Sequence, residues 1–345
     1  MEQYAGLDVS LEETFVCVVD REGRKVWSGK CESTPAAIDR TLRSKARQLV
    51  RVGLESGPLS TWHWHGLREL GQPVVCLDAR HAHAALSVQS NKTDANDAEG
   101  LAQITRTGWY REVQVKSLDS HLMRTLIGSR RLLVDMRTRI TNHLRGILKT
   151  FGLVVGKVSG QAFIQRVQEL TNDNNELGLT VSSLVISLER IAEQILVMES
   201  RIKKRAREDE VCRRLMTVPG VGPMTALAFI SVIDDPGRFP KSSSVGAYLG
   251  LTPRRYQSGE VDRNGRISKC GDKLLRYHLF EAATTLLTRV AKWSRVKAWA
   301  MGIAKRRGSK KAKVALARKL AVIMHRIWLD GANFRWSDKP QPSAS

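Results

Sequence analysis

The chain has 345 residues, with 56 Lys and Arg against 34 Asp and Glu, which gives a formal net charge of +22 at pH 7. Its hydrophobic fraction of 42% is enough to bury full-sized cores and excludes a wholly disordered chain. No apolar run approaches the roughly 20 residues of a membrane span, and the start lacks a charged segment followed by an apolar one. These features predict a cytoplasmic protein with no membrane partner.

The N-terminal part predicts a mixed α/β fold. Its second expected strand contains the continuous apolar run 16–19, which is typical of a strand covered on both faces. A hairpin followed by alternating helices and strands is typical of a layered α/β arrangement. In chain order we expect strands over 4–10, 14–20 and 25–31, a helix over 35–48, a strand over 51–55, a helix over 61–70 and a strand over 73–78.

After residue 93 the pattern is helical. Apolar residues from Leu122 to Ile147 recur at near-heptad spacing and predict one long amphipathic helix. A polar stretch over 171–176 predicts a loop. Beyond it, apolar residues between Val181 and Ile202 repeat with alternating spacings of 3 and 4. These heptads predict a coiled coil, paired either between chains or back onto the preceding helix.

The C-terminal part is predicted to be mainly helical. The segment 219–222, PGVG, lies between two apolar helical stretches, as in a helix-hairpin-helix. A loop is expected over 238–271, enclosing a short apolar patch at 245–251, and helices are expected over 273–288 and 310–328. The predicted domains are 1–115 for the α/β part, 116–210 for the helical linker and coiled coil, 211–330 for the basic part and 331–345 for a tail.

The positive charge is concentrated at the C-terminal end. Residues 1–97 hold 12 basic and 13 acidic side chains, residues 98–200 hold 13 and 10, and residues 201–345 hold 31 and 11. The last part therefore carries a net charge of +20 and is predicted to bind a polyanion. Nucleic acid is favoured over an anionic membrane, because the basic residues are spread over several segments rather than along one amphipathic helix.

The cysteines predict neither a disulfide framework nor a zinc site. They are odd in number, far apart and without a CxxC pair. We therefore expect them to act as small hydrophobic residues. They are Cys17, Cys31, Cys76, Cys212 and Cys270.

Four acidic residues in the first hundred predict a metal site. Asp8 lies within the first strand pattern, and Glu55 closes the strand VGLE at a Ser-Gly-Pro turn. Asp94 and Asp97 begin a helix at i, i+3 spacing, which puts both carboxylates on one face. Converging carboxylates need divalent cations, and oxygen-only ligands favour Mg²⁺ or Mn²⁺. The alternatives are that Asp94 caps a helix with Thr93 and that Glu55 is a surface carboxylate.

The C-terminal part offers a nucleophile and phosphate ligands. Ser258 lies near Arg254 and Arg255, whose guanidinium groups could stabilise charge on a phosphodiester that the serine attacks. A loop serine is more often only a turn former, and a basic run is often a solvated helix face. Gly220 and Gly222 would let backbone N–H groups approach a phosphate. Further phosphate contacts are predicted at Arg263, Arg266, Lys269, Lys273, Lys310 and Lys311.

Several motifs together resemble the insertion-sequence-110 family of transposases, to which Piv-type DNA invertases are related. The resemblance runs from about residue 4 to 328. The motifs are GLDVS, GLESG, NKTDANDAEGLA, VPGVGPMTA, GAYLGLTPRRYQSGE and GRISKCGDKLLR.

The resemblance implies a RuvC-like domain of the ribonuclease-H type, a coiled-coil linker and a C-terminal transposase domain. It implies that Asp8, Glu55, Asp94 and Asp97 form a DEDD tetrad that binds Mg²⁺, and that Ser258 is a nucleophile forming a covalent phosphoserine link to DNA. It also implies donor and target DNA as substrates, a bridge RNA as guide, homodimers that assemble into homotetramers, and association with the nucleoid.

Two other function classes stay open from the sequence. A RuvC-like, structure-selective nuclease would hydrolyse DNA rather than rejoin it. A decayed transposase would bind nucleic acid without catalysis. Covalent attachment of DNA to the protein separates the first alternative from a serine recombinase, and retained activity after removal of a carboxylate would exclude the metal site.

Overall fold

A computed structural model describes residues 1–87, 93–172, 175–258 and 261–336. The chain divides into two compact units, Met1–Lys116 and Ser117–Ser345. In the described residues no helix is both long and apolar enough to cross a membrane. The N-terminal unit is mixed α/β and the second unit is mainly helical, which confirms the predicted fold class at this level.

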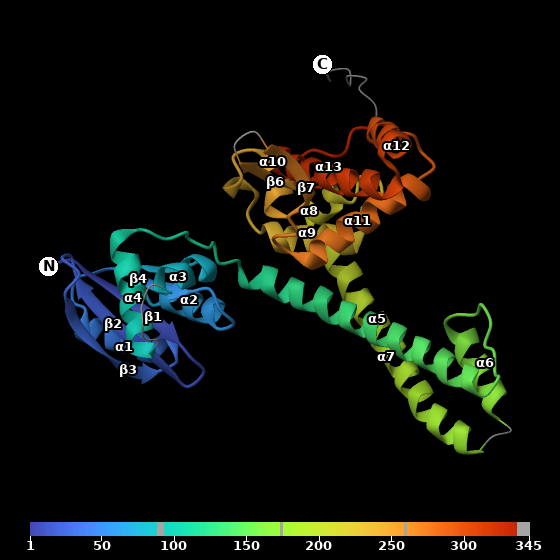
Figure 1. Ribbon diagram of the computed structural model, residues 1–345, viewed down its shortest axis with the longest axis horizontal. Helices are drawn as coiled ribbons and strands as arrows, with labels where there is room; N and C mark the ends of the chain where they lie inside the picture. The colour runs from blue at the N-terminus through green and yellow to red at the C-terminus, as the bar shows by residue number, and fades with distance from the viewer. Residues whose placement is uncertain (88–92, 173–174, 259–260, 337–345) are drawn as a thin grey trace. The chain divides into compact units, whose positions relative to one another are not determined.

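The N-terminal unit is built on a five-stranded sheet of order β3-β2-β1-β4-β5 (Figure 1). Strands β1, β2 and β3 form an antiparallel meander, and β4 and β5 run parallel to β1. Each strand overlaps a predicted one. The strands are β1 (Gln3–Val9), β2 (Glu13–Asp20), β3 (Lys25–Glu32), β4 (Leu49–Glu55) and β5 (Val74–Leu77).

Helices cover both faces of this sheet. On one face, α1 (Pro35–Lys45) and α2 (Ser60–Glu69) pack against alternate side chains of β1 and β2. On the other face, α4 (Asp94–Thr107) packs against the remaining side chains of β2, and α3 (Ala79–Leu86) packs against α4. Residues 16–19 of β2 are fully buried, which confirms the prediction of a strand covered on both faces.

Helix α4 lies very close to the sheet because two strands present glycine to it. A Cβ atom on Gly6 of β1 would lie 2.3 Å from the Ala98 carbonyl oxygen and the Ala102 nitrogen. A Cβ on Gly53 of β4 would lie 1.9 Å from the Thr105 hydroxyl oxygen. Helix α4 is therefore held against the centre of the sheet by contacts that only glycine permits.

We expect Gly6→Ala to lower the free energy of unfolding by about 2–3 kcal/mol or more, because the added methyl group meets the backbone of α4, which cannot rotate away. Urea unfolding of the full chain measures this loss. Gly57→Ala is the control, because a Cβ at Gly57 meets nothing within 4 Å. Equal stability of the two variants would contradict the close packing.

The second unit begins with a pair of long helices, α5 (Leu118–Thr150) and α7 (Asn175–Glu208). They run antiparallel, since Asp119 accepts a hydrogen bond from Arg205 at 2.5 Å and Glu199 pairs with Arg130. The predicted heptad positions Val181, Leu188, Ile195 and Ile202 are buried. Of the two pairings predicted for α7, the one onto the preceding helix is therefore present. Pairing between chains stays a prediction, as does a coiled coil.

Sequence reasoning missed α6 (Gln161–Thr171), which packs on α7 through the buried side chains Phe163, Ile164 and Val167. The loop predicted over 171–176 is shorter than expected, because Thr171 still belongs to α6 and α7 begins at Asn175. Residues 173 and 174 lie outside the described residues.

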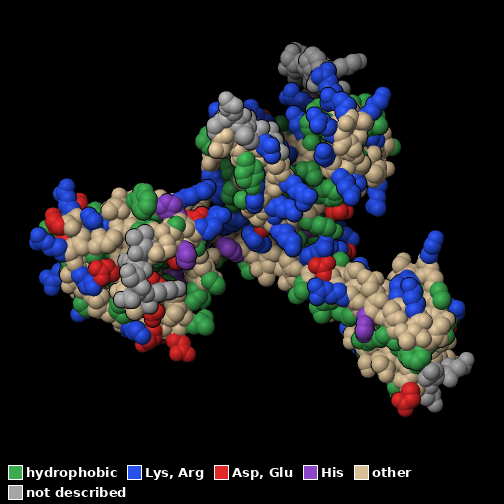
Figure 2. Space-filling view, in the orientation of Figure 1, with side chains coloured by type: hydrophobic (Ala, Val, Ile, Leu, Met, Phe, Trp, Pro, Cys, Tyr) green, Lys and Arg blue, Asp and Glu red, His purple; other side chains and the backbone are tan. Residues whose placement is uncertain are grey.

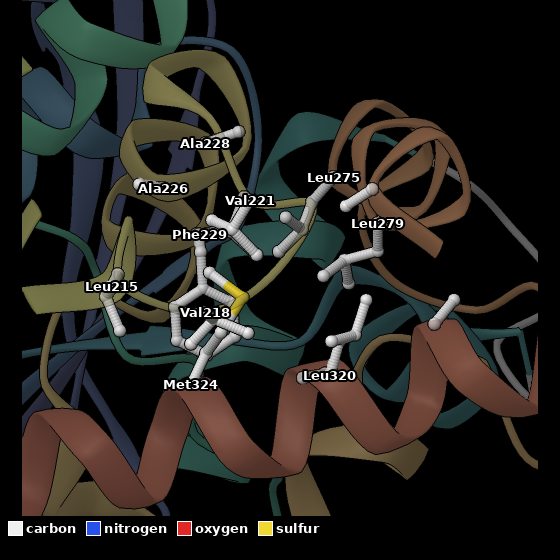
Figure 3. Close-up of a cluster of buried hydrophobic side chains, with 14 of the residues drawn as sticks. Leu215, Val218, Val221, Ala226, Ala228, Phe229, Leu275, Leu279, Leu320 and Met324 are labelled. Carbon is white, nitrogen blue, oxygen red and sulfur yellow. The ribbon is translucent and has the colours of Figure 1, made fainter. Parts of the chain in front are cut away.

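The rest of the second unit is helical around the apolar helix α9 (Pro223–Ile233). Figure 3 shows Phe229 of α9 among Leu215, Val218 and Met324, with Leu275, Leu279 and Leu320 in the same cluster. The helices around α9 are α8 (Glu210–Leu215), α10 (Ser242–Tyr248), α11 (Lys273–Thr288), α12 (Arg295–Arg307) and α13 (Ser309–Asp330). A 3₁₀ turn spans Pro236–Arg238.

The loop predicted over 238–271 is wrong. This segment contains α10 and then a two-stranded antiparallel hairpin of β6 (Pro253–Ser258) and β7 (Val261–Ile267). Every side chain of β6 is exposed, so the strand has no alternation of apolar and polar residues to reveal it. Helix α12 was missed for a similar reason, because among its residues only Ala300 is buried.

The cysteines are all free. Cys17, Cys76 and Cys212 are buried, as expected of small hydrophobic residues, and burial raises the pKa of the Cys17 thiol to about 11. Cys270 is exposed, so the prediction is wrong for that residue.

His278 of α11 is a buried titratable group in the second core. Burial and, to a smaller extent, the positive charges of Arg130 and Arg131 together lower its pKa to about 4, against an opposing effect of Asp272. The unfolded chain takes up this proton near pH 6.5, whereas the folded chain does not until about pH 4. The contribution of His278 to stability is therefore complete above pH 6.5 and is lost as the pH falls from 6.5 toward 4.

We expect the free energy of unfolding of the second unit to fall by about 2 kcal/mol between pH 7 and pH 5 on account of His278. Urea titrations at the two pH values measure this difference for the wild type and for His278→Phe. The variant should lose this part of the pH dependence, whatever its absolute stability. An equal pH dependence of the wild type and His278→Phe would show that folding does not shift the pKa of His278.

Candidate active site

Asp8 and Glu55 lie side by side at one end of the sheet. Strands β1 and β4 are parallel and pair Leu7 with Leu54, so the next residue of each strand is Asp8 and Glu55. Side chains alternate along a strand, and each acid therefore lies on the same face as the glycine two residues before it, the face that α4 covers. Both acids are half-buried and line one pocket of about 740 Å³.

Helix α4 directs its N-terminus toward this same end. Ala98 and Ala102 contact Gly6, whereas Gln103 donates a hydrogen bond of 2.7 Å to the Gly23 carbonyl oxygen, in the turn beside the start of β1. The helix therefore runs opposite to β1, and its first turn, with Asp94 and Asp97, points toward the end of β1 that carries Asp8.

The electrostatic surroundings of Lys30 agree with this placement of α4. Lys30 of β3 pairs with Phe15, which in turn pairs with Asp8, and Asp94 contributes electrostatically to the raised pKa of Lys30. The main cause of that raised pKa is a 2.9 Å hydrogen bond from Lys30 to Glu13. All four predicted acids thus belong to one end of the N-terminal unit.

The first turn of α4 is capped by Thr93. Its hydroxyl oxygen accepts a hydrogen bond of 3.2 Å from the backbone nitrogen of Asn96. Asp94 is exposed and Asp97 is half-buried, and both complement the partial positive charge of the helix N-terminus. The capping role considered for Asp94 therefore belongs to Thr93, and both carboxylates are placed where they could also face a cation.

The pocket contains two further acids that sequence reasoning missed. Glu12 lies in the tight turn between β1 and β2, Glu13 is the first residue of β2, and both line the pocket with Ser10. The signal was the hairpin itself, because a turn of three residues between Val9 and Glu13 must bring the chain back beside the end of β1. Lys30 pairs with Glu13 at 2.9 Å and partly offsets its charge, whereas Glu12 adds to the negative charge of Asp8 and Glu55.

The carboxylate oxygens at this site suit a hard cation whose remaining ligands come from water and the substrate. Within the described residues, no three His, Cys, Asp or Glu side chains gather closely enough to form a metal cage. Mg²⁺ is typically bound by one or two carboxylates together with water and substrate phosphates, and Asp8 with Glu55 supplies such a pair. The residues therefore fit Mg²⁺ or Mn²⁺ held jointly with a phosphate.

Ser258 ends β6 and is exposed at the tip of the β6–β7 hairpin, paired with Val261. Arg254 and Arg255 lie earlier on the same strand and are also exposed, and the Arg254 guanidinium donates to the Ser268 carbonyl oxygen at 3.2 Å. On β7, Arg263 and Arg266 are exposed. The hairpin therefore exposes Ser258 and four arginines on its two strands.

The base of the hairpin is fixed to α11. Arg276 donates hydrogen bonds to the carbonyl oxygens of Leu249 and Cys270, at 3.2 and 2.5 Å. Gly250 is required there, because a Cβ atom would lie 2.2 Å from the Cys270 carbonyl oxygen. Arg276 thus positions the hairpin. The predicted phosphate ligands Lys269, Lys273, Lys310 and Lys311 are all exposed in this unit.

The two glycines of PGVG differ in their surroundings. Gly220 has φ +84°, and a Cβ atom on it would lie 2.4 Å from the Ala282 carbonyl oxygen of α11, so its first role is to let the turn pack on α11. Gly222 precedes α9 and faces open space. Phosphate binding by these glycines and a helix-hairpin-helix both stay predictions, and Gly222 is the better placed of the two.

Comparison with known proteins matches two family models. One, described as transposase of the IS116/IS110/IS902 family, matches residues 212–298. The other, described as a DEDD transposase of the IS110 type, matches residues 5–152. The second match covers the pocket lined by Asp8 and Glu55, called the carboxylate pocket below. The first match covers the β6–β7 hairpin with Ser258, called the serine hairpin below.

Similar proteins have related descriptions. A putative transposase of Sinorhizobium fredii is 32% identical over 86% of this chain and 88% of its own length. The transposase for insertion sequence element IS1111A of Coxiella burnetii is 29% identical over 94% of this chain and 88% of its own length. The pilin gene-inverting protein of Moraxella lacunata is 30% identical over 33% of this chain and 35% of its own length.

Proposed function

We propose that this chain, which belongs to the IS116/IS110/IS902 family of transposases, cuts and rejoins DNA strands through a serine nucleophile assisted by a divalent metal. It is accordingly a transposase or recombinase enzyme. The observation that carries the proposal is that Asp8 and Glu55 lie side by side at adjacent strand ends, in a chain that also exposes Ser258 on one strand with Arg254 and Arg255.

The N-terminal unit is proposed to be a RuvC-like domain of the ribonuclease-H type. The strand order β3-β2-β1-β4-β5, with an antiparallel meander and two parallel strands, supports this assignment, as does the family match over this unit. Asp8 and Glu55, the adjacent pair, would hold Mg²⁺ or Mn²⁺ together with a DNA phosphate, and Asp94 and Asp97 on α4 would complete the DEDD tetrad. When bound, the metal supplies positive charge that stabilises a phosphate under attack.

Ser258 is proposed to attack the phosphorus of a DNA phosphodiester. The serine hydroxyl loses its proton as its Oγ bonds to phosphorus, the bond from phosphorus to one deoxyribose oxygen breaks, and that oxygen takes up a proton to leave as a hydroxyl. The overall change transfers one proton from the serine to the leaving oxygen. Arg254 and Arg255 would stabilise the charge that develops on the phosphate. The covalent phosphoserine keeps the phosphoester linkage, so a new strand end can displace the serine and rejoin the DNA.

The C-terminal part is proposed to bind nucleic acid mainly by contacting the sugar-phosphate backbone of the nucleic acid. A net charge of +20 on residues 201–345 supports contacts with phosphates, which carry no sequence information by themselves. Donor and target DNA would then be selected by pairing with a bridge RNA, within a dimer that assembles into a tetramer. Sequencing the RNA that copurifies with the protein tests the guide: one enriched structured species supports it, and no enriched species opposes it.

The carboxylate pocket also fits a second function, which is hydrolysis of DNA. A pocket with several carboxylates can also support hydrolysis, as in a structure-selective nuclease. The direct test incubates the purified protein, its copurifying nucleic acid and Mg²⁺ with a plasmid that carries the element ends. Recombined junctions support the transposase, whereas free cut ends without joined products support the nuclease.

A further inference from the structure

Two indole side chains are exposed at α12, far along the chain from the serine hairpin. Trp293 is 60% exposed and Trp299 is 44% exposed. Ser294, between them, is buried and caps α12 by accepting a hydrogen bond of 3.2 Å from the backbone nitrogen of Lys297. The cap fixes Trp293 just outside the helix, while Trp299 lies on the helix one turn in.

A lysine ammonium group lies near each of the two indole rings. The Lys297 ammonium lies 5.9 Å from the Trp293 ring centroid, and the Lys319 ammonium, from α13, lies 6.0 Å from that of Trp299. Arg295 and Arg306 are exposed and lie four residues before and seven residues after Trp299, which puts them on the same helix face. Figure 2 shows Lys and Arg side chains gathered around α12.

The indoles are not buried in the core of this unit. Ala300 is the one buried residue of α12, and Trp293 and Trp299 each leave about half of their surface in water. A single exposed aromatic side chain needs no partner by itself, but a lysine ammonium over the exposed Trp299 ring makes a surface that suits an anionic ligand able to stack. A protein partner fits poorly, because the cores of protein interfaces are depleted of lysine, whereas this surface has a cation beside every ring.

We propose that the surface formed by Trp299, Arg295, Arg306 and Lys319 binds unpaired nucleotides. The Trp299 indole would stack on an exposed base while the cations contact the adjacent phosphates, as in proteins that bind single-stranded nucleic acid. Base pairs in a duplex have their faces covered by their neighbours, so the surface favours single strands, either of RNA or of opened DNA. This inference rests on the proposed function, since it assigns one part of the nucleic acid that the transposase would hold.

The test is binding of the full-length protein to fluorescent 20-nucleotide oligomers of one sequence, as single-stranded RNA, single-stranded DNA and duplex DNA. For Trp299→Ala we expect about 5- to 100-fold weaker binding of the single strands, which is the effect of losing one stacked base. Duplex affinity should change by less than about twofold, because the phosphate contacts are kept. Trp299→Phe should restore most of the single-strand affinity.

Two controls separate stacking from charge and from folding. Trp62→Ala removes an equally exposed indole, 49% exposed, from the neutral N-terminal unit and should leave all three affinities unchanged. Arg306→Gln should lower the slope of log affinity against log salt by about 0.7–0.9, whereas Trp299→Ala should leave that slope unchanged.

The outcomes distinguish the two proposals. Equal loss on RNA and DNA supports recognition of any unpaired base, and a larger loss on RNA identifies the guide as the ligand. If the wild type binds all three oligomers and Trp299→Ala binds them equally well, the stacking surface is rejected while the transposase proposal stands. If the wild type binds none of the oligomers, both proposals are rejected.

Discussion

Ser258→Ala is expected to lower the rate of strand cleavage and rejoining by at least about 10³-fold, the scale on which enzymes lose activity when their nucleophile is removed. The covalent protein–DNA complex should disappear altogether. The fold should not change, because Ser258 is exposed at the end of β6 and its neighbours on that strand are exposed as well. Quantitative PCR of recombined junctions and denaturing gels of trapped complexes measure the two losses.

The matched control for this change is Ser243→Ala, which removes an exposed serine from α10 of the same unit. It should recombine at the wild-type rate. Binding of duplex DNA should be equal in both variants, since the arginines of the hairpin remain. Cleavage by Ser258→Ala at the normal rate would remove the serine mechanism and leave hydrolysis as the better account.

Asp8→Asn is expected to lower Mg²⁺-dependent cleavage by at least about 10²-fold, because the loss of a metal ligand costs several kcal/mol of charge stabilisation at the phosphate. The substitution keeps the size of the side chain, and Asp8 is only half-buried, so the sheet should remain intact. Single-turnover cleavage across a Mg²⁺ titration measures the change, and DNA binding should stay near the wild-type value.

Asp20→Asn provides the comparison for Asp8. Asp20 lies in β2 at the opposite end of the same sheet, where its side chain accepts a hydrogen bond of 2.8 Å from the backbone nitrogen of Arg24. An amide oxygen can still accept that bond, so activity and its Mg²⁺ dependence should be unchanged. Full activity of Asp8→Asn together with a wild-type Mg²⁺ dependence would reject the metal site.

The sequence is most informative where hydrophobic pattern and burial agree. The run at residues 16–19 predicts a strand covered on both faces because it lies in the middle of a three-layer unit. The placement of Asp8 and Glu55 at strand ends could be predicted, because turn residues follow both strands. Their direct adjacency could not be predicted, because it depends on the parallel pairing of β1 with β4, and hydrophobic periodicity does not reveal the strand order.

Helices and strands without a buried face could not be predicted from the hydrophobic pattern of the sequence. The β6–β7 hairpin exposes every side chain of β6, and α12 buries only one residue, so neither carries a hydrophobic period. Glu12 and Glu13 reach the carboxylate pocket because the β1–β2 hairpin brings the chain back beside the end of β1. The role of Ser258 comes from resemblance to a family rather than from its own chemistry, and for that reason it is the position that experiment should test first.

The most direct measurement maps the covalent link between protein and DNA. The protein is allowed to react with a substrate, the complex is denatured and digested with trypsin and nuclease, and the peptides are analysed by mass spectrometry. The mechanism predicts a nucleotide attached to Ser258 in the peptide spanning residues 256–263, YQSGEVDR. Cleaved DNA with an unmodified peptide, or an adduct on another residue, would contradict it.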